Sequence, residues 1–248
     1  MTINIELVNQ INLKLKKLNK NLGWQEILYP WLRTNITYSS NFIEGSTLTL
    51  LETSLVINDN ISVGGKNMRE LFEAKNHALA WDWAMENIIL NGKKTIQKSD
   101  ILTLHSFILK NIDEINAGKF RAGNVRISGS VTLFPSPTKV YDLVIELMGW
   151  LENQNTEDII KTAMLMHLKL VKIHPFSDGN GRTCRLVSNC ILMQNGLPPI
   201  DIVPENRLEY LMSLEKSTSQ NPQPFLDFLL KQYNDNLDQY LETFEGTN

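Results

Sequence analysis

The chain has 248 residues, of which 42% are hydrophobic and 21% charged, and its formal net charge is -3. This length suits one large domain or a core domain with an appended segment, and the mild acidity argues against a general nucleic-acid binder, which normally carries a basic excess on one face. The sequence has no uninterrupted apolar stretch of the kind that a signal peptide or a membrane span requires, so we expect no membrane partner and a cytoplasmic location.

The spacing of apolar residues predicts a mainly α protein. Apolar side chains recur every three to four positions, as on one face of a helix, in most of the chain. The predicted helices span residues 5–18, 24–42, 68–89, 101–112, 140–151, 159–173, 183–193 and 225–241. The sequence shows neither an internal repeat nor a flexible linker. We therefore expect a helical bundle, with an N-terminal helical region of residues 1–95 and a core of residues 96–248.

Residues 118–137 break the helical pattern, because they are rich in glycine and proline. Residues 124–128 alternate in character as a strand does, residues 131–134 provide a return strand, and Gly129-Ser130 forms a turn signal between them. The segment therefore predicts a small β-hairpin between helices. A hairpin of two strands is only marginally stable alone, so it must lean on the surrounding helices.

The segment of residues 174–185 reads His-Pro-Phe-Ser-Asp-Gly-Asn-Gly-Arg-Thr-Cys-Arg. Because proline disfavours helical backbone in the residue before it, we expect the preceding helix to end near His174 and to leave this side chain on a loop. Gly179-Asn180-Gly181 then supplies a flexible backbone before the next helix. Free amides and the positive end of that helix can face an anion, so this stretch predicts a phosphate cradle.

Three charged residues of the same segment fit this interpretation. Arg182 and Arg185 lie three apart, hence on one helical face, and arginine is suited to bidentate phosphate contacts. Asp178 precedes the cradle and offers oxygen ligands for a magnesium ion that bridges phosphates. Each signal alone is typical of an ordinary turn or a solvated face. Together they place a base, a metal ligand and phosphate-binding groups within twelve residues.

Residues 174–185 resemble the Fic family signature HxFx(D/E)GNGRxxR at every specified position. Upstream, residues 40–45 (Ser-Asn-Phe-Ile-Glu-Gly) are similar to the inhibitory motif (S/T)xxxE(G/N) of the Fic subclass with an N-terminal inhibitory helix. Residues 104–105, 118–121, 135–137 and 197–200 also resemble parts of the Fic core. The likeness covers roughly residues 36 to 230 and implies a Fic-fold helical bundle with the hairpin as its flap.

The resemblance implies a protein adenylyltransferase, which moves AMP from ATP with Mg²⁺ onto a Ser, Thr or Tyr hydroxyl and releases pyrophosphate. The acceptor would be a target protein or the enzyme itself. His174 would be the catalytic base, and Asp178 would hold the metal. The implied nucleotide-binding residues are Gly179, Asn180, Gly181, Arg182, Thr183, Cys184, Arg185 and Tyr210, the last packing against adenine. The implied flap residues, which would pair with the target backbone, are Ile127, Ser128, Gly129 and Ser130.

Ser40 and Glu44 form the implied inhibitory motif. They lie four apart and share one face of a predicted helix. The resemblance, rather than the spacing, supplies Arg185 as the partner of the Glu44 carboxylate, and this pairing would turn the α-phosphate of ATP away from attack. One departure from some relatives is Thr218, near which they hold the nucleotide with an asparagine.

The sequence leaves three alternatives to AMP transfer. A Doc-like transfer of the γ-phosphate is disfavoured because such cradles carry a lysine in place of the second glycine, here Gly181. Removal of AMP is compatible with Glu44, which could orient a water molecule. A non-catalytic module that responds to nucleotide is disfavoured by His174, since a pure binder needs no base. The target and the oligomeric state, including a homodimer, are left open.

Overall fold

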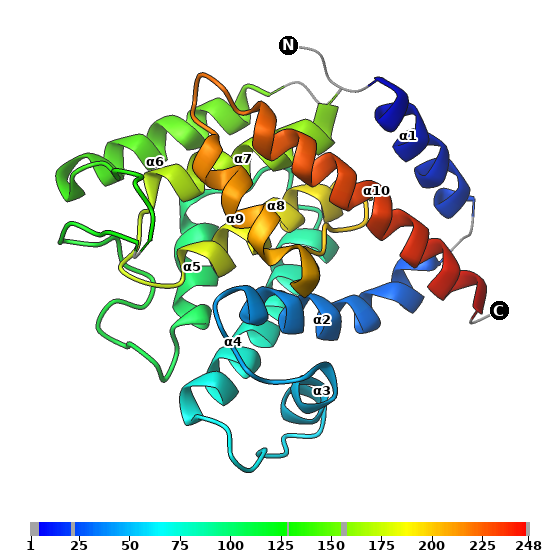
Figure 1. Ribbon diagram of the computed structural model, residues 1–248, viewed down its shortest axis with the longest axis horizontal. Helices are drawn as coiled ribbons and strands as arrows, with labels where there is room; N and C mark the ends of the chain where they lie inside the picture. Colours follow the sequence, from blue (N-terminus) through cyan, green and yellow to red (C-terminus); the bar gives the residue numbers. More distant parts are fainter. Residues whose placement is uncertain (1–4, 21–22, 128, 155–157, 247–248) are drawn as a thin grey trace.

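The computed structural model describes residues 5–20, 23–127, 129–154 and 158–246 (Figure 1). These ranges are mainly helical, as predicted, and contain no strand. Two short helical turns, η1 (Met85–Leu90) and η3 (Pro204–Asn206), follow α4 and precede α9. The α-helices are α1 (Ile5–Asn19), α2 (Trp24–Ile43), α3 (Leu50–Asn58), α4 (Met68–Ala84), α5 (Lys98–Ile108), α6 (Pro137–Glu152), α7 (Ile159–Ile173), α8 (Asn180–Met193), α9 (Arg207–Lys216) and α10 (Gln223–Gly246).

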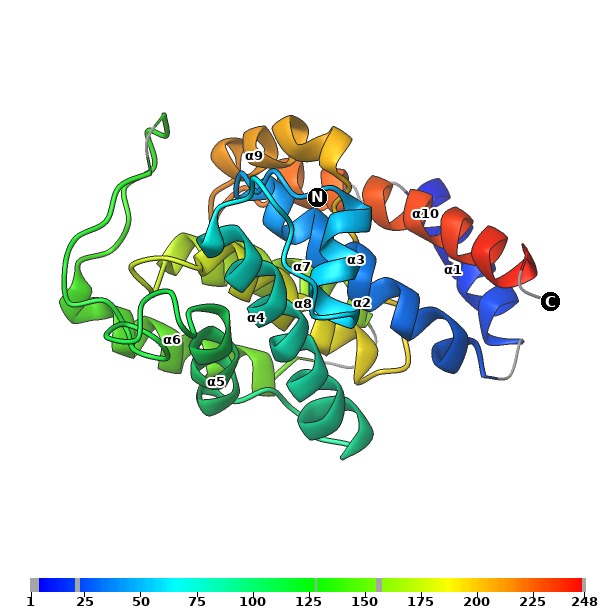
Figure 2. The same ribbon diagram turned by 90° about the horizontal axis from the view of Figure 1, so that it is seen from below.

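The α-helix α8 lies at the centre of the bundle, with α2, α4, α5 and α7 packed around it (Figures 1 and 2). Every residue of α8 except Gly181 is buried. Its neighbours contribute to a single hydrophobic core that includes Trp24 of α2, Trp81 of α4 and Tyr233 of α10. The N-terminal region and the catalytic core proposed from the sequence therefore share one hydrophobic interior. A second, smaller cluster joins α3 to α4 through Val56 and Leu71.

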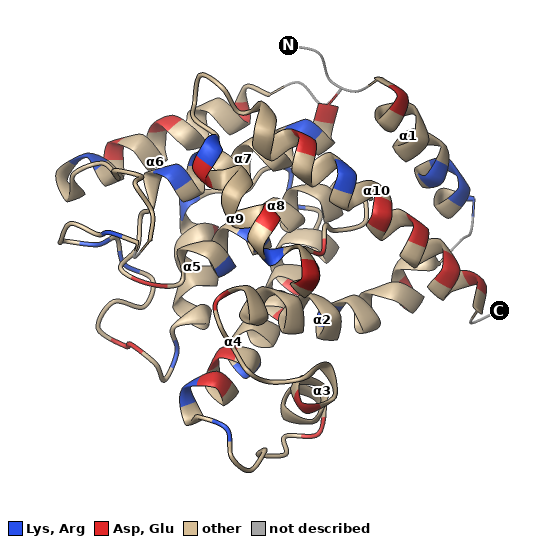
Figure 3. Cartoon of the chain, viewed as in Figure 1, with Lys and Arg blue, Asp and Glu red and all other residues tan. Residues whose placement is uncertain are grey.

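The first helix is held on the last one by hydrophobic burial and by opposite charges. Ile11 and Leu18 of α1 are almost fully buried. Lys14 forms an ion pair with Asp238 of α10 at 2.6 Å, and the basic face of α1 lies opposite the acidic end of α10 (Figure 3). Exposed ion pairs contribute little to stability, so the buried side chains hold α1 in place. Within the described ranges, no helix combines the length and the apolar character needed to cross a membrane.

Two helices, α3 and α9, were not predicted from the sequence. The helix α3 has only nine residues, too few to show a clear period. The helix α9 exposes Leu208, Leu211 and Met212, so its apolar residues do not mark a single buried face. The predicted helix at residues 159–173 coincides with α7, and that at 24–42 falls one residue short of α2.

The prediction of a β-hairpin at residues 118–137, hereafter the flap, is wrong as regards its strands. The flap projects from the part of the bundle near α6 (Figure 2), and its far end contacts α9. That end is a turn closed by a hydrogen bond from Ser130 N–H to the Ile127 carbonyl at 3.2 Å. The groups beyond that turn bind a side chain of α9 instead of a facing strand: Val131 N–H donates to Glu215 Oε1 at 2.9 Å. An isolated hairpin gains too little from its own pairing to compete with such contacts. Ser128 lies outside the described residues.

Candidate active site

His174 lies where α7 ends, as the following proline predicts. Its backbone has φ 51° in the left-handed region, and its N–H donates to the Leu170 carbonyl at 3.1 Å. This conformation is uncommon for a residue other than glycine. Because Pro175 cannot continue the helix, the chain turns sharply here and presents the imidazole at the helix exit.

The imidazole of His174 lies in an environment that keeps it neutral. Burial lowers the pKa of His174 to about 4, and the positive charge of Arg121 acts in the same direction, whereas the Val171 carbonyl, Glu44 and Asp178 act to raise it. The ring lies 4.2 Å from that of Phe134, measured between centroids. Nδ1 is buried and forms no hydrogen bond of normal geometry with the described residues, so Nε2 is the ring nitrogen that remains for a ligand to reach. A neutral imidazole of this kind can act as a general base near pH 7.

The loop between His174 and α8 is shaped for the start of a helix. Gly179 caps α8 with φ 73°, and a Cβ atom there would lie 3.1 Å from the Ile108 side chain, so glycine is required. The Asn180 side chain closes the loop onto Phe176, because it accepts from the Phe176 N–H and donates to its carbonyl, both at 2.9 Å. The backbone amides at the start of α8 therefore remain the groups that can bind an anion.

His105 of α5 binds this loop through a hydrogen bond and a ring contact, a role that the sequence did not reveal. Gly118 N–H donates to His105 Nδ1 at 3.0 Å, so Nε2 carries the hydrogen and donates to the Asp178 carbonyl at 3.0 Å. The imidazole also stacks on Phe176 with ring centroids 3.6 Å apart. Burial lowers the pKa of His105 to about 4, which keeps this tautomer neutral.

Arg185 is bound on several sides by the end of α2. Its Nε donates to Ser40 Oγ at 2.9 Å, and Nη2 donates to the Ser40 carbonyl at 2.9 Å and to Glu44 Oε1 at 2.6 Å. Arg185 is 6% exposed, whereas the Glu44 side chain is 36% exposed. The ion pair between Glu44 and Arg185, expected from the family resemblance, is thus present in the structure.

The Glu44 carboxylate also occupies the start of α8. A Cβ atom added to Gly181 would lie 2.3 Å from Glu44 Oε1, so the carboxylate packs directly against the glycine backbone. The amino end of a helix favours negative charge. A carboxylate of the chain itself therefore stands where an anionic ligand of this helix end would bind.

Asp178 and Arg182 are paired with two residues of α4 that the sequence did not single out. Arg182, which is 2% exposed, lies 3.1 Å from Glu73 Oε1 and 3.4 Å from Asp178 Oδ1. Arg69 forms an ion pair with Asp178 and another with Glu73 at 3.0 Å. Although burial opposes it, Arg182, the Gly179 amide and Arg69 together hold the pKa of Asp178 below its usual value.

A polar cavity of about 290 Å³ adjoins these charges. Its lining residues are Glu44, Gly45, Ser46, Asn67, Arg69, Glu70, Glu73, Asp178 and Arg182. In the part of the chain that the structure describes, no group of three or more metal-binding side chains gathers at one place. Mg²⁺ is commonly held by one or two carboxylates together with substrate phosphates, so Asp178, with its carboxylate partly exposed, fits a metal that arrives with a nucleotide.

Three residues expected to contact the nucleotide turn away from the cradle. Thr183 is buried and donates to the Gly179 carbonyl at 2.8 Å, and burial raises the pKa of the Cys184 thiol. Tyr210 is 1% exposed and lies behind Arg185, with its hydroxyl 3.0 Å from His167 Nε2. An adenine cannot stack on Tyr210 in this structure, because the periodicity of α9 turns that ring into the core.

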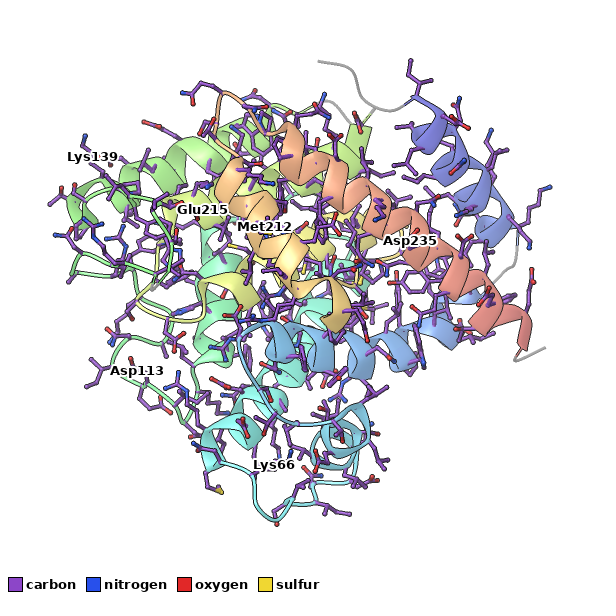
Figure 4. The ribbon with its side chains drawn as sticks, in the orientation of Figure 1. Lys66, Asp113, Lys139, Met212, Glu215 and Asp235 are labelled. Atoms are coloured by element: carbon purple, nitrogen blue, oxygen red, sulfur yellow. The ribbon has the colours of Figure 1, made fainter. Side chains whose placement is uncertain are left out.

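The neighbours of Tyr210 line a second cavity of about 290 Å³, between the flap and α9. Met212 and Glu215 lie on the same helix, as Figure 4 shows. The cavity adjoins His174 through Phe134, whose ring contacts the imidazole. Its lining residues are Ile127, Gly129, Ser130, Thr132, Phe134, Val171, Lys172, Leu211, Met212, Leu214 and Glu215.

Comparisons with known proteins agree on one family. A sequence model of the Fic/DOC family matches residues 95–192. The chain is 34% identical to a protein of Drosophila virilis named protein adenylyltransferase Fic, over 241 residues that make up 96% of this chain and 46% of that protein. The chain therefore spans a little less than half the length of the curated relatives that it matches.

Solved structures extend the likeness to the whole fold. Residues 134–508 of Fic-1 from C. elegans have a TM-score of 0.88 and 27% identity, with 98% of this chain and 73% of that chain covered. A Fic family protein from Desulfovibrio desulfuricans G20 has a TM-score of 0.80 and 30% identity, with 98% of this chain and 76% of that chain covered.

Proposed function

Since the chain belongs to the Fic family, we propose that it is a protein adenylyltransferase, which transfers AMP from ATP to a hydroxyl of a target protein. The observation that carries this proposal is the position of His174, a neutral base six residues before α8, whose amino end already receives a carboxylate. A base beside an anion site is what nucleotidyl transfer requires. The names of the relatives support the same activity.

In the proposed reaction, the target hydroxyl attacks the α-phosphorus of ATP while Nε2 of His174 accepts its proton. The bond between the α-phosphorus and the oxygen bridging to the β-phosphate breaks, and pyrophosphate leaves. The backbone amides of residues 179–181 and the guanidinium groups of Arg182 and Arg185 would stabilise the negative charge that develops on the phosphates. Because Arg182 is bonded to Glu73 and Asp178, it must exchange a carboxylate for a phosphate when ATP binds.

Asp178 is the residue that would hold Mg²⁺, which neutralises charge on the phosphates when it is bound. Its carboxylate is partly exposed and borders the polar cavity, and it would give up its contact with Arg69 to take this role.

We assign the adenine to the cavity between the flap and α9, and not to a stacking position on Tyr210. The cavity is apolar on several sides, through Phe134, Val171, Leu211 and Met212, and its volume of about 290 Å³ suits a purine ring. It also lies beside His174, so that an adenine there and phosphates at α8 would place the α-phosphorus near the base.

Glu44 would restrain this activity, since its carboxylate holds Arg185 and occupies the phosphate position. The same residue supports a second candidate function, the removal of AMP from a modified protein. Among the described residues, Glu44 Oε2 has no hydrogen-bond partner, and the side chain is 36% exposed. This free oxygen is available to orient a water molecule for attack on a phosphodiester.

Incubation with ATP labelled separately at the α and γ positions tests the proposal. Labelling of protein from the α position alone, with release of pyrophosphate, is the expected result. Transfer of the γ label would instead indicate phosphorylation. Labelling from neither position, in the wild type and in a Glu44→Gly variant, would contradict AMP transfer.

A further inference from the structure

Arg121 lies at the base of the flap with its charge buried. The residue is 5% exposed, and the structure shows no ion pair between it and any carboxylate of the described residues. A buried charge without a counter-ion is costly unless its donors are satisfied. Here the guanidinium donates only to backbone carbonyls, so its function is to be inferred from the segments to which those carbonyls belong.

The three carbonyls belong to the two arms of the flap and to the catalytic base. Nη1 donates to the Gly123 carbonyl at 2.9 Å on the outgoing arm, and Nη2 donates to the Pro135 carbonyl at 2.6 Å on the returning arm. Nε donates to the His174 carbonyl at 2.7 Å. One rigid guanidinium therefore fixes the distance between both arms of the flap and the backbone of the base.

The backbone of Arg121 adds a fourth link to the same turn. Its N–H donates to the Pro175 carbonyl at 2.9 Å. His174 has a left-handed backbone, which is unfavourable for a residue with a Cβ atom and persists only where the surroundings over-determine it. Two successive carbonyls of this turn, at His174 and Pro175, are held by Arg121.

We propose that Arg121 is a positioning residue, which holds the flap and His174 in a fixed relation so that a hydroxyl presented by the flap meets Nε2. The inference rests on the proposed function, because it assigns Arg121 a part in that same transfer. Within the described residues, Arg121 acts through His174 and the flap and does not contact the phosphate cradle, which is built from α8 and α2; its only link to the proposed adenine cavity is through the flap.

The charge of Arg121 supports this assignment. After burial, Arg121 is the main contributor to the lowered pKa of His174, against Glu44, Asp178 and the Val171 carbonyl, which act to raise it. Loss of the guanidinium should therefore move the pKa of His174 upward as well as loosen the flap.

The test compares Arg121→Gln with Arg121→Lys, each made in the wild type and in the Glu44→Gly background. Lys119→Gln is the control, because it removes an exposed positive charge two residues away. Three quantities are measured: the pKa of His174 by NMR titration, the dependence of self-labelling rate on ATP concentration, and hydrogen exchange of the flap amides. Thermal unfolding shows which variants are folded.

We expect Arg121→Gln to raise the pKa of His174 toward 6.5 and to lower the maximal labelling rate by about tenfold or more. The KM for ATP should rise by a smaller factor, because the flap also lines the proposed adenine cavity. Arg121→Lys should keep the low pKa but still lower the rate, since an ammonium cannot span three carbonyls. The control should behave as the parent protein does.

A folded Arg121→Gln variant with an unchanged rate and an unchanged pKa of His174 would overturn the proposal. So would a rate loss matched by an equal rise in the KM for ATP, which indicates general damage to the site. If Arg121→Gln does not fold, a parental rate in Arg121→Lys overturns it. If none of the variants incorporates label, the proposed AMP transfer is wrong. The role of Arg121 is then still tested by two measurements on Arg121→Gln, the pKa of His174 and the exchange rate of the flap amides, and no change in either would overturn it.

Discussion

Replacement of Glu44 by glycine is the perturbation whose effect follows most directly from the site. The carboxylate lies 2.6 Å from Arg185 Nη2 and packs against Gly181, so under the proposed function it would compete with ATP phosphates for both the guanidinium and the end of α8. Removal of Glu44 leaves the Ser40 contacts of Arg185 intact, including that of Nη2 with the Ser40 carbonyl, and frees the second N–H of Nη2. We therefore expect Glu44→Gly to raise AMP incorporation above that of the wild type.

The size of this increase can be worked out from the contact. A hydrogen bond to a charged group contributes about 1.5–3 kcal/mol, and 1.4 kcal/mol corresponds to about a tenfold change in an equilibrium. If Glu44 must leave Arg185 before ATP binds productively, its removal should increase labelling by about 10- to 100-fold. Glu44→Gln, which keeps the bulk over Gly181 but loses the charge, should fall between wild type and Glu44→Gly.

The assay is incorporation of label from α-labelled ATP into purified protein at equal concentrations. Glu26→Gly serves as a control, because Glu26 is exposed in α2, the helix that ends just before Glu44, and lies far along the chain from the cradle. Adding His174→Ala to Glu44→Gly should abolish the gain. Equal labelling of wild type and Glu44→Gly would refute the competition argument, and weaker labelling of the variant would favour a positive catalytic role for Glu44.

The remaining predictions concern the base, the metal ligand and acid stability. His174→Ala should slow AMP transfer by roughly 10²-fold or more with ATP affinity retained in equilibrium dialysis; near-normal transfer would exclude His174 as the base. Arg69→Gln should lower the Mg²⁺ concentration needed for half-maximal transfer several-fold, because Asp178 loses a competing partner, whereas Asp178→Asn should raise it; an unchanged requirement in both would contradict the metal assignment. Stability, measured as the urea midpoint, should fall as pH falls from 7 to 5, because burial lowers the folded pKa values of all four histidines to about 3 or 4. The unfolded chain therefore binds more protons than the folded chain below about pH 6.5. Asp201, whose pKa is raised to about 6, acts in the opposite direction but is a single group, and a midpoint that rises as pH falls would contradict the burial of the histidines.

The parts of the site that sequence reasoning predicted are those set by neighbours in the chain. The end of α7 at His174 follows from the proline after it, and the start of α8 follows from Gly179. Both are consequences of backbone restrictions that act over one or two residues. The helical class likewise follows from periodicity, which is a local property.

Contacts between distant residues were beyond such reasoning. Arg69 and Asp178 are 109 residues apart, and neither spacing nor composition brings them together. Glu44 and Arg185, 141 residues apart, were paired only through the family resemblance. The burial of Tyr210 depends on how α9 packs, and the missing strands of the flap depend on Glu215. Each of these features is decided by tertiary packing, which overrides local preference.

The position of Glu44 has a consequence for how fast the proposed inhibition could be lifted. Glu44 is the first residue beyond α2, whose inner face is packed into the core through Leu32 and Ile36, so the helix itself cannot detach cheaply. The carboxylate, in contrast, is partly exposed and is joined to the backbone through rotatable side-chain bonds. Side-chain rotations of this kind take picoseconds to nanoseconds, whereas movements of packed helices take microseconds to milliseconds. If Glu44 restrains AMP transfer as proposed, its ion pair with Arg185 would open and close many times within one turnover, and the resting activity would report the fraction of time that Glu44 spends away from Arg185.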